Sequence, residues 1–131
     1  MSAVDVLLRG RARAEEQMID ECVITRPGEA VTDPDTGDVT PGSAATIYAG
    51  KCEVRTRDTI AANPEAGEHT FTVVSRVVKI PANRADVRDG DVVKLTKSAL
   101  NAFTVGKEYR VEGFTPDTYE TAAKLPVKEI L

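Results

Sequence analysis

The sequence predicts a mainly β protein, a small antiparallel β-barrel or sandwich of about six strands preceded by one N-terminal α-helix. Apolar residues recur at helical spacing only within the first 20 residues, and from Glu21 onward they alternate with polar residues. Turns rich in glycine, proline and aspartate separate the alternating runs. The 131 residues are therefore divided into a helix at 1–20 and a single barrel domain at 21–131.

The predicted helix spans residues 2–19, with Ser2 as its N-cap and Asp5 completing a capping box. Its apolar residues form one stripe that we expect to pack on another surface. These residues are Val4, Leu7, Leu8, Ala14 and Met18. Arg9, Arg11 and Arg13 form either a solvated face of the helix or a contact with a partner.

Residues 21–26 and 46–57 alternate as two half-buried strands. The prolines between them prevent regular pairing at several points, so residues 27–45 are predicted to form a long hairpin with an exposed acidic tip at 32–42. A tight loop at 36–38 would place Cys22 directly opposite Cys52. Two cysteines in a cytoplasmic chain predict buried thiols that lie close together without a bond.

The remaining strands are predicted from shorter runs. Residues 69–81 are apolar on both faces, which indicates a central strand covered on both sides. Residues 90–96 and 106–114 follow glycine turns and alternate. Residues 121–131 also alternate, but Pro126 cannot donate a hydrogen bond, which predicts an edge strand open to another chain. The stretch at 57–69 is too polar to pack and is predicted to be a flexible loop.

Composition limits the function. The formal net charge of −4, from 21 acidic and 17 basic residues, disfavours stable binding to nucleic-acid phosphates. No apolar run approaches the roughly 18 residues of a membrane span, and no secretion signal is recognisable, so we expect a cytoplasmic protein that does not enter a membrane.

The sequence contains no pattern typical of catalysis. The single histidine, His69, stands at the junction of a polar loop and a strand, without an acid–base partner nearby in sequence. Residues 33–38 resemble part of a calcium loop but lack the glycine and glutamate that complete one. We therefore predict a protein that is not an enzyme and uses no cofactor or metal.

The order of the motifs along residues 10–131 resembles the head-completion or stopper proteins of long-tailed bacteriophages, especially those that infect actinobacteria. The motifs are "MIDECVITR", "DPDTGDVT", "IYAGKCEVR", "VVKIP", "GDVVKLT", "GKEYRVEGF" and "TAAKLPVKEI". The resemblance implies a ring of six or twelve copies, with the portal or adaptor ring above it and the tail terminator or tail tube below. Genomic DNA would pass through the ring without specific binding.

The same resemblance implies a location at the head–tail interface of the virion, after assembly in the host bacterial cytoplasm. An acidic ring agrees with this, since it repels the phosphates of passing DNA. A tail terminator or tail-tube protein remains an alternative. A small-barrel nucleic-acid-binding module and an unrecognised enzyme are further alternatives, the latter requiring a pocket where carboxylates converge.

Two sets of site residues follow from the resemblance and from exposure. The candidate channel gate is the loop at 58–69, with Asp58, Thr59, Ile60, Asn63, Pro64, Glu65, Gly67 and Glu68. The candidate contacts between subunits or rings are Asp33, Asp35, Gly37, Asp38, Arg9, Arg13, Leu125, Val127 and Leu131. The residues of the terminal segment belong to this set because an edge strand exposes apolar surface.

Overall fold

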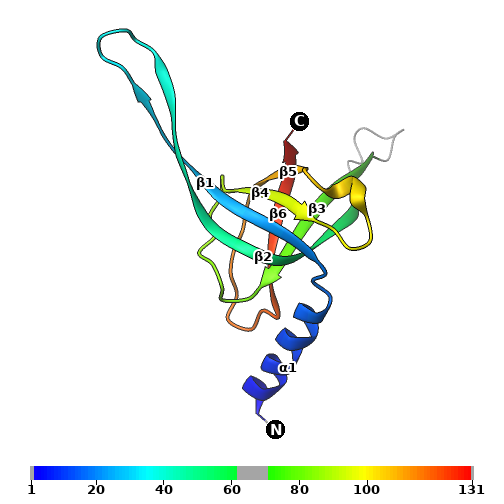
Figure 1. The fold of residues 1–131 in the computed structure, drawn as a ribbon. Helices are drawn as coiled ribbons and strands as arrows, with labels where there is room; N and C mark the ends of the chain where they lie inside the picture. The colour runs from blue at the N-terminus through cyan, green and yellow to red at the C-terminus, as the bar shows by residue number, and fades with distance from the viewer. Residues whose placement is uncertain (1, 62–70, 131) are drawn as a thin grey trace.

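The structure is a computed structural model that describes residues 2–61 and 71–130. One helix precedes a closed antiparallel barrel with the strand order β1-β2-β3-β6-β5-β4 (Figure 1). The elements are α1 (Ala3–Glu16), β1 (Asp20–Thr32), β2 (Val39–Ala61), β3 (Phe71–Pro81), β4 (Val92–Lys97), the 3-10 turn η1 (Ala102–Thr104), β5 (Glu108–Val111) and β6 (Ala122–Ile130). The predicted fold class is confirmed.

The barrel is filled from the inward-facing side of every strand. Each strand contributes alternate residues to one cluster, as the pleat of a β-strand requires. The cluster comprises Cys22, Ile24, Cys52, Val78, Ile80, Val87, Val93, Leu95, Tyr109, Val111, Ala123, Leu125 and Val127. Val87 reaches this cluster from the loop between β3 and β4, so that loop helps to fill the barrel.

Helix α1 has the predicted capping box. The Ser2 hydroxyl accepts a hydrogen bond from the Asp5 amide at 3.2 Å, and the Asp5 carboxylate accepts one from the Ser2 amide at 3.3 Å. The helix ends at Glu16, earlier than predicted, and none of its residues is buried. Of the predicted stripe only Met18 is buried, and it lies just beyond the helix. Leu7 and Ala14 are half-buried, whereas Val4 and Leu8 are exposed, so the predicted packing of the stripe is met only in part.

The contact between α1 and the barrel lies towards the second half of the helix. A Cβ atom on Gly10 would come within 2.9 Å of the Thr121 methyl group, so glycine permits the close approach here. The Arg11 Nε donates to the Glu120 carbonyl at 3.1 Å. Glu15 forms an ion pair with Lys51 at 3.1 Å. The first turns of α1 extend away from the barrel (Figure 1).

Strands β1 and β2 pair in a register that differs from the predicted one. Cys22 lies opposite Gly50, and Cys52 lies opposite Asp20, so the pairing is displaced by two residues. The tip is a longer turn than expected, because pairing ends at Thr32 and Val39 and the ladder contains three register shifts. An even displacement keeps both cysteines on the inner face. Both thiols are buried and unbonded, as predicted.

The prolines at 27 and 41 lie within the two strands, which continue beyond the barrel as a two-stranded hairpin. Gly28 and Gly42 face one another where the register shifts. A Cβ atom on Gly28 would lie 2.4 Å from the Ser43 carbonyl oxygen, and one on Gly42 would lie 2.2 Å from the Glu29 carbonyl oxygen. The close crossing of the two strands therefore requires glycine at both positions.

The prediction that residues 121–131 form an edge strand is wrong. β6 pairs with β3 over 122–127 and with β5 over 127–130. The Pro126 carbonyl accepts from the Glu112 amide at 2.9 Å, so the backbone of Pro126 faces β5 at the end of that short ladder. Proline has no backbone N–H to donate. At position 126 this absent donor would face the β5 side, where β5 has already ended, so the pairing of β6 with β3 is preserved.

β3 is also not a central strand covered on both sides. Val78 and Ile80 point into the barrel, whereas the alternate residue Val77 faces outward and is partly exposed. The outer apolar residues of β3 therefore misled the sequence interpretation, because a barrel strand has only one buried face.

Candidate interaction surfaces

The hairpin at residues 27–45 is fixed to the barrel at its root. Arg26 donates from Nε to Asp91 Oδ1 at 3.0 Å, and from Nη2 to Asp91 Oδ2 at 3.1 Å and to the Asp86 carbonyl at 2.7 Å. Asp91 is only 1% exposed, and it also accepts from the Arg88 amide. The hydrogen bond to Asp91 raises the pKa of Arg26. This clasp fixes the point at which β1 leaves the barrel.

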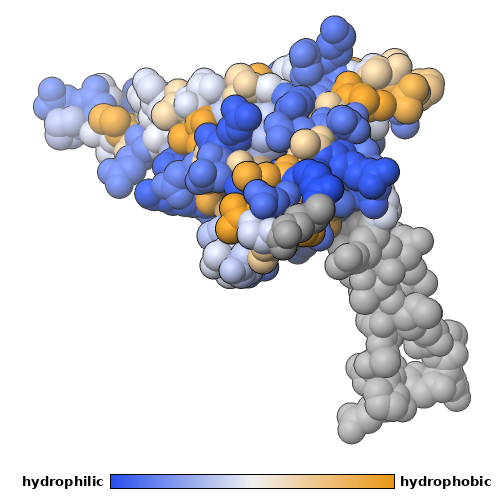
Figure 2. All heavy atoms as spheres, turned by 90° about the horizontal axis from the view of Figure 1, so that it is seen from below, coloured by the Kyte–Doolittle hydropathy of each residue, from blue (hydrophilic) through white to orange (hydrophobic). Residues whose placement is uncertain are grey.

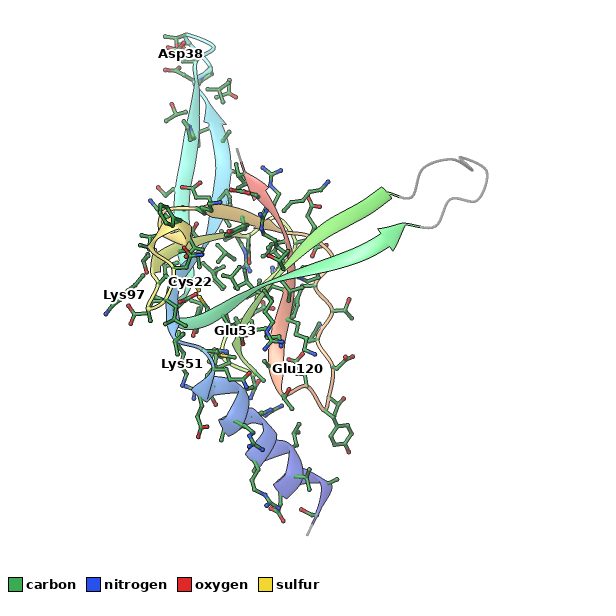
Figure 3. All side chains as sticks on the ribbon, turned by 90° about the vertical axis from the view of Figure 1, so that its right-hand side faces the viewer. Cys22, Asp38, Lys51, Glu53, Lys97 and Glu120 are labelled. Carbon is green, nitrogen blue, oxygen red and sulfur yellow. The ribbon has the colours of Figure 1, made fainter. Side chains whose placement is uncertain are left out.

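The hairpin tip is an ordered turn that presents carboxylates to solvent. Asp33 Oδ1 accepts from the Asp35 amide at 2.8 Å, and the Asp33 carbonyl accepts from the Gly37 amide at 2.8 Å. The hydrogen bond from the Asp35 amide lowers the pKa of Asp33. Gly37 has a φ of +74°, which favours glycine at this position. Figure 3 shows Asp38 at the far end of the hairpin from Cys22 in the barrel.

The net charge of the protein is located in this hairpin. Residues 27–45 contain four acidic residues (Glu29, Asp33, Asp35 and Asp38) and no lysine or arginine. Subtracting these four from the 21 acidic residues leaves 17, which equals the 17 basic residues elsewhere. No residue from Pro27 to Ala45 is buried. The hairpin is therefore an acidic arm on a barrel-and-helix body that is neutral overall.

Two further surfaces expose apolar side chains. Val4, Val6 and Leu8 on α1 are each more than half exposed. Leu100 and Phe103, around η1, are 85% and 90% exposed. In Figure 2, which views the molecule from below, apolar residues appear in separate patches among hydrophilic ones. These side chains are apolar surface that a neighbouring protein could cover.

The environment of the barrel interior favours the protonated forms of the Cys52 thiol and the Tyr48 hydroxyl. A hydrogen bond with Cys22, together with burial, raises the pKa of the Cys52 thiol, which disfavours the reactive thiolate. Burial raises the pKa of Tyr48 to about 12, and its hydroxyl donates to the Lys51 carbonyl at 2.7 Å. Within residues 2–61 and 71–130, no three histidine, cysteine or acidic side chains are grouped as a metal site. No helix in those ranges is long and apolar enough to cross a membrane.

The structure separates the predicted site residues into different groups. Asp33, Asp35, Gly37 and Asp38 lie together at the exposed hairpin tip, and Arg9 and Arg13 lie exposed on α1. Leu125 and Val127 are buried in the barrel, so their prediction as contact residues is wrong. Leu131 lies outside the described residues. The sequence interpretation missed the Arg26–Asp91 clasp, because no local pattern relates residues 65 positions apart.

Three of the predicted gate residues lie in a strand. Asp58, Thr59 and Ile60 belong to β2 and pair with Val74, Val73 and Thr72 of β3, so they are not in a loop. The cause is β-strand pairing beyond the barrel, which the polar composition of 57–69 concealed. The other gate candidates, Asn63, Pro64, Glu65, Gly67 and Glu68, lie outside the described residues.

The fold and its surfaces define a small closed β-barrel with an acidic hairpin arm and a projecting N-terminal helix. The chain belongs to DUF6093, a family of unknown function whose model matches residues 10–128. No curated protein and no solved structure matches the chain.

Proposed function

We propose that this protein is a structural component of the head-to-tail connector of a long-tailed bacteriophage, where it acts as the stopper. In this role, copies form a ring below the portal or adaptor ring, retain the packaged DNA and provide the docking surface for the tail. The proposal originates in the order of sequence motifs, and the surfaces of the folded chain support it. Among the described residues, no three histidine, cysteine or acidic side chains are grouped so that they would suggest a metal site instead.

One observation carries the proposal: three separate segments extend or expose surface that the barrel itself does not cover. They are the hairpin at 27–45, the first turns of α1, and the apolar turn around Phe103. The hairpin and α1 extend from the barrel in opposite directions, as Figures 1 and 3 show. A ring subunit between two other rings has neighbours at its sides, above and below, which matches this distribution of uncovered surface.

A phage that encodes the protein provides the direct test. Deletion of the gene should yield heads that package DNA but lose it and that carry no tails, and expression of the intact protein should restore infectious particles. Electron microscopy of the particles distinguishes the alternatives. Heads that stay filled beside tails of irregular length would indicate a tail terminator, and heads that stay filled without any tail tube would indicate a tube protein. Normal particles would reject a connector role.

The gate is tested separately. β2 ends at Ala61 and β3 begins at Phe71, so an Asn-Gly turn can replace residues 62–70 while the strand pairing is retained. If this segment closes the channel, the shortened protein should join heads to tails but retain less DNA. Complete DNA retention with normal tail joining would exclude residues 62–70 as the plug.

A further inference from the structure

The outer wall formed by β3, β6 and β5 carries an unusual arrangement of charge. Lys79 lies directly opposite Lys124, and Arg110 lies directly opposite Lys128. Like charges directly opposite one another on a sheet destabilise it. The strands therefore hold basic residues where uncharged or acidic ones would be more favourable for the isolated barrel. Such an arrangement indicates a surface that meets negative charge from outside.

A shallow hollow of about 320 Å³ lies within this wall. Val77 and Pro126 line it together with Arg55, Lys79 and Lys124. Acidic residues are also present nearby: Glu53 is opposite Lys79 and bonds to Arg55, and Glu108 and Glu112 are exposed on β5. The basic wall, defined as Arg55, Lys79, Lys124, Arg110 and Lys128, thus has five positive charges against three negative ones.

The centre of the basic wall, on β6, lies across the barrel from β1, the strand that leads into the hairpin. In the closed order β1-β2-β3-β6-β5-β4, β1 and β6 are three positions apart and therefore face each other across the barrel. The hairpin extends from the β1 side, and about nine residues at roughly 3.3 Å each give it a reach of about 30 Å. Complementary surfaces on opposite sides are what a head-to-tail contact in a ring requires.

We propose that the acidic hairpin of one copy docks on the basic wall of the next copy, with its tip at the hollow lined by Val77 and Pro126. Glu29, Asp35 and Asp38 face the positive charges of the wall, while Asp33 mainly shapes the turn. The inference rests on the proposed function in that both require copies of this chain to meet in a ring. It adds the two surfaces that meet.

Charge reversal on each surface tests the contact. One variant reverses the charge of the hairpin by Glu29→Lys, Asp35→Lys and Asp38→Lys. It keeps Asp33, which forms the turn. A second variant reverses the charge at two positions of the basic wall, by Lys124→Glu and Lys128→Glu. Each variant should weaken self-association at low salt at least about 10-fold, as measured by sedimentation velocity, because close interfacial charge pairs contribute at least this much. The two sets combined should restore association, and high salt should weaken the wild-type contact.

Two controls separate binding from folding. Glu16→Lys, Gln17→Lys, Asp117→Lys and Thr118→Lys together change the net charge by the same amount as the hairpin variant, at exposed positions outside the strands, and should leave association unchanged. The wall variant places glutamate opposite Lys79 and Arg110, so its melting temperature should equal or exceed that of the wild type. A wall that is less favourable for folding yet needed for association would support a binding role.

Several results would overturn the inference. One is a wild-type protein that remains monomeric at low salt up to about 1 mM. Another is association that neither variant changes, which would leave a ring formed through other surfaces. A third is a wall variant that loses binding to a duplex oligonucleotide but associates normally, which would assign the wall to DNA. The particles formed after deletion of the gene test the connector role independently of these three results.

Discussion

The barrel and the hairpin at residues 27–45 are both built from antiparallel pairing, but they are stabilised differently. Every barrel strand contributes side chains that are 8% exposed or less, whereas no residue of the hairpin is buried. The hairpin therefore depends on backbone pairing, on a glycine crossing and on the clasp at its root. Burial of apolar surface stabilises the barrel as one cooperative unit, while the hairpin can open locally at much lower cost.

Substitutions in the core are expected to have the largest effect on the free energy of unfolding. Leu125→Ala should lower the free energy of unfolding by about 2–5 kcal/mol, because it removes a fully buried side chain and leaves a cavity. Leu100→Ala is the matched control, since Leu100 is 85% exposed, and should change stability by no more than about 0.5 kcal/mol. Urea unfolding measures both. Similar losses for the two variants would contradict the assignment of the core.

The next effect is expected at the junction between the two regions. Arg26→Ala leaves the buried carboxylate of Asp91 without its charged partner and should lower the free energy of unfolding by more than the loss of an exposed ion pair does. Arg55→Ala removes an arginine from an exposed ion pair and should cost less than about 1 kcal/mol. Chemical denaturation measures the difference. Equal costs would show that the clasp contributes no more than a surface pair.

A local effect is expected within the hairpin. Gly42→Ala would place a methyl group against the Glu29 carbonyl, so the strand crossing must open while the barrel retains its stability. Hydrogen exchange should become faster for amides near residue 42 and remain unchanged at Val93 and Leu95. Ser43→Ala, on the neighbouring exposed residue, serves as the control. Faster exchange throughout the barrel would contradict the independence of the two regions.

The smallest effect concerns the turn at the hairpin tip. Because the pKa of Asp33 lies below its ordinary value of 3.8, its contribution to the folded turn is present above pH 3.8. That contribution is lost as the pH falls through the lowered pKa. A carboxyl NMR titration should show Asp33 titrating at lower pH in the native than in the urea-unfolded protein. Asp33→Asn should remove the acid dependence of the turn, and identical native and unfolded midpoints would contradict the hydrogen bond.

Several elements were predictable from the sequence because their signals are local. The Ser2 capping box, the alternation along β1, β2 and β6, and the acidic hairpin turn each depend on residues within a few positions of one another. The exposure of the hairpin tip was therefore predicted correctly, and its role as a contact site stays a prediction. The shared inner face of Cys22 and Cys52 was also predicted, although their pairing was displaced by two residues.

The sequence by itself determined where the barrel strands lie along the chain, which face of most of them is apolar and where the acidic residues collect. Only the tertiary structure decided the register, the closure of the barrel, the burial of Leu125 and Val127, the partner of Arg26 and the outer wall where Lys124 faces Lys79. The physical reason is that these features arise from contacts between residues far apart in the chain. A proline that marks an edge in an open sheet is accommodated in a closed barrel where the neighbouring strand has already ended.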